Sequence, residues 1–89
     1  MFVAKVYVML KEGILDPQGA TIGKALKNLG YQDVQDVRVG KFIKLTLNGA
    51  DKEKLEKQVD EMCHRLLSNP VIESYTFEVE SVPVGGKDS

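Results

Sequence analysis

Alternating apolar and polar residues predict a long strand in the middle of the chain. The apolar side chains share the odd positions, at Val37, Val39, Ile43, Leu45 and Leu47. A period of two is typical of a strand that buries one face. We therefore expect residues 34–47 to form a strand on which the other elements pack.

Gly40 interrupts this strand, although the apolar positions have the same parity on both sides of it. A two-residue hairpin at Gly40 and Lys41 would turn the later apolar residues to the opposite face, so it is disfavoured. A bent or bulged continuous strand and a three-residue turn over residues 40–42 both keep them on one side. Both interpretations stay open.

The first ten residues, MFVAKVYVML, predict another strand because they are rich in β-branched and aromatic side chains. One parity is wholly apolar, with Phe2, Ala4, Val6, Val8 and Leu10. The other carries Val3, Tyr7 and Met9 around Lys5, which is too apolar for a face left in water. We expect both faces of this strand to be covered.

A first helix is predicted from Pro17 to Leu29, with Asp16 as its N-cap and Gly30 as the left-handed residue after it. The stripe Ile22, Ala25, Leu26 and Leu29 is expected to face the sheet. Gly19 and Gly23 offer either a flexible first turn or a smooth surface for close packing of another backbone.

A second helix is predicted from its N-cap Asp51 to about Ser68, where Asn69 and Pro70 end it. Its apolar stripe comprises Leu55, Val59, Met62, Cys63, Leu66 and Leu67. The last strand follows over residues 71–82, with Val71, Tyr75, Phe77 and Val79 on one parity.

This order of elements predicts an α+β fold: a two-layer sandwich with a mainly antiparallel sheet, both helices on one face, related to the ferredoxin-like plait. The chain of 89 residues has room for one modest core, and we assign residues 1–82 to a single domain. Residues 83–89 have little to bury and are expected to form a flexible tail.

Composition narrows the choice of partners. The net charge of −1 does not indicate nucleic-acid binding, and no apolar run approaches the roughly 20 residues of a membrane helix. The single cysteine, Cys63, excludes a disulfide within the chain, and the first residues do not resemble a signal peptide. We expect a cytoplasmic protein.

The sheet face away from the helices is the candidate binding surface. It is expected to carry apolar residues from all three strands: Val3, Tyr7, Met9, Phe42, Ile72 and Val82. Such a patch favours a symmetric homo-oligomer, with an ordinary scatter of surface hydrophobic residues as the alternative. The charged residues expected to flank it, and to pair with a partner's carboxylates, are Lys5, Arg38 and Lys41. Solvent-facing charges are the equally open alternative for these three.

Candidate chemistry is sparse. Cys63 and His64 are adjacent on a helix and project about 100° apart, so they do not form a nucleophile and base pair. One cysteine and one histidine are too few for the usual zinc site, and no phosphate-binding glycine motif is present. We predict no catalytic, cofactor-binding or metal-binding residue.

Four segments, in this order and spacing, resemble the PurS subunit family of phosphoribosylformylglycinamidine synthase: KVYVMLKEGILDPQG, ALKNLGY, VQDVRVGKFIKLTL and MCHRLLSNPVIESYTFEVE. The resemblance implies a non-catalytic accessory subunit of a ligase complex in purine biosynthesis. That subunit would bridge a glutaminase and a large synthetase, assist ammonia transfer, and form a dimer or a dimer of dimers. ATP and magnesium would be used by the synthetase, with no cofactor on this subunit.

Two alternatives share the predicted fold. An acylphosphatase-type enzyme would need an arginine in the first strand-to-helix loop, and LKEGILDPQG has none. A small RNA- or ligand-binding module could use Tyr7 and Phe42 as a stacking platform, but the charge balance does not favour this.

Overall fold

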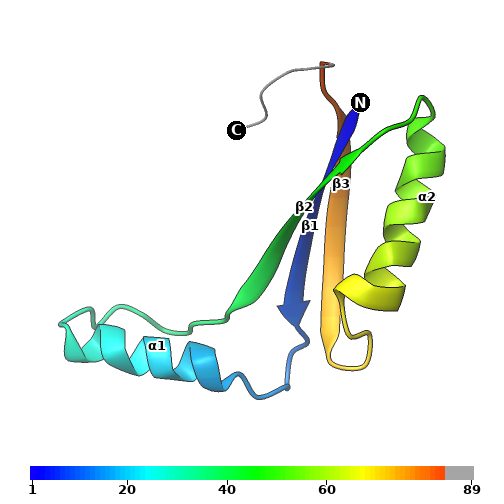
Figure 1. The fold of residues 1–89 in the computed structure, drawn as a ribbon. Coiled ribbons are helices and arrows are strands. Elements are labelled where there is room, and N and C mark those ends of the chain that lie inside the picture. The colour runs from blue at the N-terminus through cyan, green and yellow to red at the C-terminus, as the bar shows by residue number, and fades with distance from the viewer. Residues whose placement is uncertain (84–89) are drawn as a thin grey trace.

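The structure is a computed structural model that describes residues 1–83, and these form a three-stranded sheet with two α-helices (Figure 1). The strands are β1 (Phe2–Leu10), β2 (Gly40–Leu47) and β3 (Glu73–Ser81). The helices are α1 (Pro17–Asn28) and α2 (Lys52–Met62), and α2 continues into a π-helical turn, η1 (Cys63–Leu67).

The sheet has β1 at its centre, in the order β2-β1-β3. Both neighbours run antiparallel to β1, so β2 and β3 are parallel to each other. Helix α2 connects these two strands as a crossover, which makes a split β-α-β unit of the kind found in ferredoxin-like folds. The predicted α+β class and the antiparallel sheet are confirmed.

The core lies between α2 and one face of the sheet. Asp51 caps α2 as predicted, because its Oδ1 accepts from the backbone N of Glu53 at 3.1 Å and of Lys54 at 3.3 Å. The stripe of α2 then packs along β3 (Figure 1). The buried residues of this core are Phe2, Ala4, Val6, Val8, Leu55, Val59, Cys63 and Val79.

The strand predicted over residues 34–47 is shorter than expected, and it lies at an edge of the sheet, whereas β1 is the strand on which the others pair. Strand β2 begins at Gly40, so this glycine forms neither the bulge nor the three-residue turn that the sequence left open. Residues 34–39 stay outside the sheet. Val37 and Val39 continue the apolar parity of β2, but they pack beyond the sheet, and a period of two does not distinguish a paired strand from an extended segment.

Helix α1 departs most from the prediction. Its ends are as expected: Asp16 Oδ1 accepts from the Gly19 N at 2.9 Å, and Gly30 has a φ of 105°. However, α1 projects beyond the N-terminal end of β2 and is not packed along any strand of residues 1–83 (Figure 1). The prediction that both helices cover one sheet face is therefore wrong within this chain, because only α2 does so.

Close packing explains why residue 19 of α1 is a glycine. A Cβ on Gly19 would collide with the Val37 carbonyl oxygen and the Asp16 carboxylate, whereas one on Gly23 would lie 3.4 Å from Val37 Cγ2. Residues 34–38 thus return along this side of α1. We call residues 11–39 the α1 arm: the connector, the helix and the extended segment that leads into β2.

The predicted tail, residues 83–89, lies outside the described residues except for Pro83. Assignment of residues 1–82 to one domain stays a prediction. Within residues 1–83, none of the helices combines the length and apolar character needed to cross a membrane.

Candidate assembly surfaces

The sheet face opposite α2, which we call the outer face, exposes an aromatic and thioether cluster. Tyr7 and Phe42 are register partners on β1 and β2, with ring centroids 5.2 Å apart and planes tilted by 40°. Phe42 is 56% exposed, and Met9 beside them is 40% exposed. Ile72 precedes β3 and is 36% exposed. These four residues lie where the sequence predicted an exposed patch.

Val3 was predicted on the same exposed patch, and that exposure is not observed. Only 2% of its surface is accessible, even though it shares the parity of Tyr7 and Met9. Its register partners Thr46 and Glu80 are exposed. The accessible apolar part of the outer face is therefore confined to the end of the sheet nearest the α1 arm.

Charged residues occupy the middle of the outer face. Lys44, Lys5 and Glu78 are register partners across β2, β1 and β3. Lys5 Nζ also lies 3.2 Å from Glu80 Oε1, and this hydrogen bond and the charge of Glu80 raise the pKa of Lys5. Lys5 thus lies on the predicted face, with a partner in its own chain.

Arg38 and Lys41 were predicted to flank this face, and the structure places both elsewhere. Arg38 belongs to the α1 arm, where its Nη1 donates to the Ile14 carbonyl at 3.2 Å and its Nη2 to the Lys11 carbonyl at 3.1 Å. Lys41 shares the parity of Ile43 and so points to the α2 side of the sheet. Its Nζ lies 3.7 Å from Glu73 Oε2.

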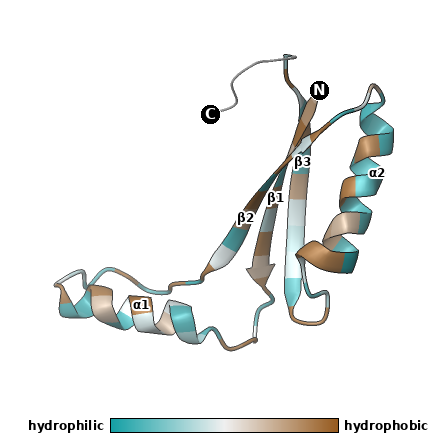
Figure 2. Ribbon diagram, in the orientation of Figure 1, coloured by the Kyte–Doolittle hydropathy of each residue, from teal (hydrophilic) through white to brown (hydrophobic). Residues whose placement is uncertain are grey.

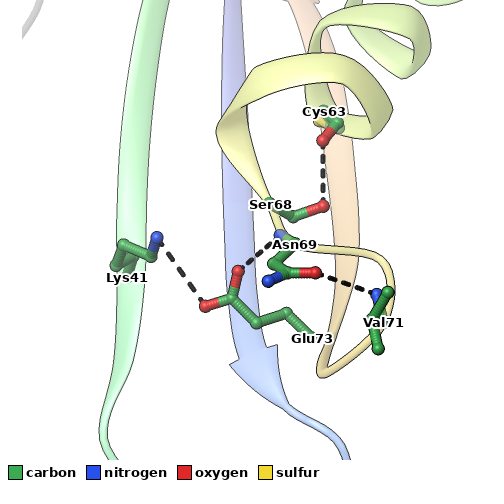
Figure 3. A network of polar contacts seen from close by, with 6 residues as sticks. All are labelled: Lys41, Cys63, Ser68, Asn69, Val71 and Glu73. Atoms are coloured by element: carbon green, nitrogen blue, oxygen red, sulfur yellow. Dashed lines mark hydrogen bonds and ion pairs between the residues drawn. The ribbon is translucent and has the colours of Figure 1, made fainter.

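Glu73 links the two edge strands to the turn after η1 (Figure 3). Its Oε1 accepts from the Asn69 N at 2.6 Å, while Asn69 Oδ1 accepts from the Val71 N at 3.1 Å. Ser68 Oγ donates to the Cys63 carbonyl at 2.9 Å and closes the π-helical turn. This network explains why the last strand begins at Glu73 and not at Val71.

The α1 arm forms a second exposed apolar surface, which sequence reasoning missed because it assigned the stripe of α1 to the core. Leu29 is 74% exposed and Ile22 is 38% exposed. Two further exposed apolar residues lie just before and just after the helix in the chain, Leu15 at 79% and Tyr31 at 61%. Figure 2 shows apolar bands on α1 with no other helix or strand packed against it. The apolar stripe of α1 was visible in the sequence, but it was expected to pack on the sheet of this chain.

Asp16 joins the beginning of α1 to the end of the extended segment that leads into β2. Besides capping α1, its second oxygen, Oδ2, accepts from the Val39 N at 2.8 Å. Hydrogen bonds from the backbone of Gly19 and of Val39 lower the pKa of this carboxyl, and Arg38 adds a favourable charge. One buried side chain thus joins the start of the helix to the segment that re-enters the sheet.

A groove of about 630 Å³ lies between α1 and the returning segment, lined by residues that include Lys24, Lys27, Asp36 and Arg38. Its volume is in the range of ligand pockets, but its charges are mixed.

Among residues 1–83 no group of three or more His, Cys, Asp or Glu side chains is placed to hold a metal ion. Cys63 is buried in the core, and burial raises the pKa of its thiol.

Comparison with known proteins gives the family. The profile of the PurS family, described as phosphoribosylformylglycinamidine (FGAM) synthase, matches residues 3–81. The chain belongs to the PurS family. It is 51% identical over 82 residues to the PurS subunit of phosphoribosylformylglycinamidine synthase from Bacillus subtilis, an alignment that spans 92% of this chain and 96% of that protein.

Solved PurS structures share the fold. Methanocaldococcus jannaschii PurS, described as one of the subunits of formylglycinamide ribonucleotide amidotransferase in the purine biosynthetic pathway, superposes with a TM-score of 0.84. It is 41% identical, with 93% of this chain and 100% of that chain covered. A chain in the PurLQS structure from Thermotoga maritima gives a TM-score of 0.80 at 31% identity, covering 90% of this chain and 99% of the other.

These comparisons confirm the resemblance carried by the four sequence segments. As a PurS protein, the chain is a subunit of FGAM synthase in purine biosynthesis. Neither the acylphosphatase-type enzyme nor the RNA-binding module is favoured by any of these matches.

Proposed function

We propose that this PurS chain is a non-catalytic subunit that holds a glutaminase and an ATP-dependent synthetase together. In the assembled enzyme, glutamine would yield ammonia, and the synthetase would use it with ATP and magnesium to convert formylglycinamide ribonucleotide to the amidine. The PurLQS structure of a relative supports an assembly role. We place this work in the cytoplasm.

The observation that carries the proposal is the presence of two separated apolar surfaces on one small chain. A subunit that bridges partners needs more than one contact surface, and large exposed apolar patches are uncommon on monomers. Here the cluster around Tyr7 and Phe42 lies on the sheet, while Leu15 and Leu29 lie on the α1 arm. The two surfaces belong to different elements and can bind different partners.

The extended shape of the chain supports the same proposal. The radius of gyration is 16.8 Å, and the molecule measures 50 × 31 × 16 Å. A compact domain of this length would have a radius of gyration of about 12 Å. The excess comes from the α1 arm, which leaves the sheet (Figure 1). An arm of this kind is stabilised when another polypeptide packs against it.

A homo-oligomer, either a dimer or a dimer of dimers, is part of the proposal. The α2 side of the sheet is itself incompletely covered, since Ile43, Leu45 and Leu47 of β2 are only half-buried. Additional copies of the chain would supply more apolar cover than one helix provides.

Reconstitution tests the function. Purified glutaminase and synthetase subunits are mixed with and without this protein, and product formation is measured with glutamine or with ammonium as nitrogen donor. We expect the glutamine-dependent rate to require the protein and the ammonium-dependent rate to need it much less. Equal glutamine-dependent turnover without the protein would overturn the assembly role.

A matched pair of variants directs the test to the α1 arm. Leu29→Glu places a charge in the exposed apolar stripe of α1, whereas Gln58→Glu places the same charge on the solvent-exposed side of α2. We expect only Leu29→Glu to lower the glutamine-dependent rate. Equal rates for both variants would exclude the stripe as a contact surface.

A further inference from the structure

The connection between η1 and β3 exposes two large apolar side chains. Leu66, in η1, is 83% exposed, and Val71, in the turn before β3, is 78% exposed. Neither belongs to the cluster on the outer face or to the α1 arm. We call residues 66–71 the apolar turn. It is a third exposed apolar surface, and it lies where β3 begins, at the end of the sheet where β1 ends (Figure 1).

The π-helical turn explains why Leu66 faces solvent. Val59 and Cys63 have no accessible surface, and a regular α-helix would place Leu66 on the same side as these two residues. The Ser68 N instead donates to the Cys63 carbonyl at 3.0 Å, and this bond widens the turn beyond that of an α-helix. As a result Leu67, and not Leu66, packs against the core. Such π-helical turns are frequent at functional sites.

Hydrogen bonds hold the apolar turn in one conformation. The Asn69 carbonyl accepts from the Glu73 N at 2.7 Å, and the Asn69 side chain accepts from the Val71 N (Figure 3). Lys11 secures the turn from the end of β1, because its Nζ donates to the Pro70 carbonyl at 2.7 Å. A surface that is already ordered binds a partner at a lower entropic cost than a flexible one. The apolar turn is therefore preorganised for contact.

Two cations lie at the apolar turn. Arg65 precedes Leu66 and is exposed, and Lys11 reaches the turn through its bond to a carbonyl oxygen. Neither cation forms an ion pair with a carboxylate of residues 1–83. The carboxylate that ends the turn, on Glu73, lies 3.7 Å from the Nζ of Lys41 instead. A surface complementary to the apolar turn is therefore apolar at its centre and acidic at its edge.

We propose that the apolar turn docks into an apolar pocket with an acidic edge on the ATP-dependent synthetase. Two side chains bury far less than the roughly 800 Å² per partner of a stable interface, so this surface cannot by itself hold two copies of the chain together. Protruding side chains contribute most where a pocket encloses them, and pockets form preferentially between domains. The large synthetase is the proposed partner expected to contain several domains. The inference rests on the proposed function and assigns one surface to one of its partners.

Photocrosslinking identifies the partner. Leu66→Cys places an accessible thiol on the apolar turn, and Cys63 has no accessible surface, so a benzophenone maleimide labels position 66 alone. The labelled chain is irradiated in the reconstituted complex, and mass spectrometry identifies the product. We expect a crosslink to the synthetase, and much less of it from the matched control Gln58→Cys on the exposed side of α2. A crosslink to the glutaminase or to a second copy, or no crosslink, overturns the proposal.

Truncation measures what the two side chains contribute. The readout is the concentration of this protein that gives half-maximal glutamine-dependent turnover in the reconstituted complex. Leu66→Ala and Val71→Ala should each raise it by about fivefold or more. Neither should change thermal unfolding, because both side chains are exposed. Gln58→Ala is the matched control and should leave both measurements unchanged. A half-maximal concentration that neither truncation alters would contradict the docking.

Charge reversal tests the acidic edge of the pocket. Arg65→Glu should raise the same concentration by about threefold or more at low salt, and added salt should reduce the difference. Lys57→Glu makes the same change on the exposed side of α2 and should have no effect. Equal effects of the two reversals would show that the pocket has no acidic edge.

The results separate the inference from the proposed function. If the original protein does not support glutamine-dependent turnover, the proposed function fails and the inference fails with it. If the original protein supports turnover but the label at position 66 does not reach the synthetase, only the docking of the apolar turn is overturned.

Discussion

Helices α1 and α2 carry similar apolar stripes, yet only α2 is packed on the sheet. Val59 and Cys63 of the α2 segment have no accessible surface, whereas Leu29 at the end of α1 is 74% exposed. Figure 2 shows the apolar side of α2 turned toward the strands and that of α1 turned toward none. An amphipathic helix indicates that a face will be buried, but it does not indicate which polypeptide buries it.

The connections explain the difference. Helix α2 joins two parallel strands that flank β1, so the crossover itself places it over the sheet. Helix α1 joins β1 to its antiparallel neighbour β2, which a short turn could have done. The residues between them are therefore free to extend outward, and they do so as the α1 arm.

Truncation of a leucine in each helix should give the largest contrast. Leu55→Ala removes a side chain that is 6% exposed and should lower the free energy of unfolding by about 2–5 kcal/mol. Leu29→Ala should change it by no more than about 0.5 kcal/mol in dilute protein. Urea denaturation measures both, and equal losses would mean that α1 is packed in solution as α2 is.

Alanine at the two glycines of α1 should act in opposite directions. Gly19→Ala should destabilise the chain by about 1–3 kcal/mol, because the new Cβ collides with the backbone of Val37. Gly23→Ala makes only ordinary contact with Val37 and should stabilise the helix by up to about 1 kcal/mol. Thermal unfolding measures the sign, and a stabilising Gly19→Ala would show that residues 34–38 do not lie against α1.

Acid should loosen the α1 arm through protonation of Asp16. The pKa of Asp16 is lowered in the folded chain, so its contribution to stability is present above the unfolded value and is lost as pH falls through the folded value, below about pH 4. NMR of the Gly19 and Val39 amides during an acid titration should follow this loss. In Asp16→Asn the titration step should disappear, and its persistence there would assign it to another group.

High pH should break one hydrogen bond between β3 and α2, and this change in stability should be the smallest of those predicted here. The hydroxyl of Tyr75 donates to Asp60 Oδ1 at 2.6 Å, and this hydrogen bond raises the pKa of Tyr75 to about 12. The contribution of this hydrogen bond to stability is present below the unfolded pKa of about 10 and is lost as pH rises through about 12. Ultraviolet absorbance should show a late ionisation step from Tyr75, and this step should be absent in Tyr75→Phe. Ionisation of Tyr75 near pH 10 would contradict the contact.

Local features of the chain were predictable from its residues. The caps at Asp16 and Asp51, the left-handed Gly30 and the end of the helical segment near Ser68, after α2 and its π-helical turn η1, depend on neighbours within a few positions. The exposed cluster of Tyr7, Met9 and Phe42 was also predictable, because no helix was predicted on that face of the sheet, although Val3 on the same face is buried.

Features that depend on residues far apart in the chain were not predictable from the sequence. Nothing in the parity of residues 34–47 distinguished the segment beside α1 from the strand that begins at Gly40, since both are extended. Arg38 and Lys41 were expected near the outer face, but the end of pairing before Gly40 places Arg38 on the α1 arm and the pleat turns Lys41 toward Glu73. Such placements depend on where pairing ends.

The sequence by itself determined which segments are helical or extended and which side chains must leave water, because propensity, capping and periodicity act between near neighbours. Only the tertiary structure decided where those side chains go. Val59 is buried by its own sheet and Leu29 by nothing in residues 1–83, and that difference arises from strand order and connection geometry. The apolar surface that the fold leaves uncovered is the surface that the proposed assembly would use.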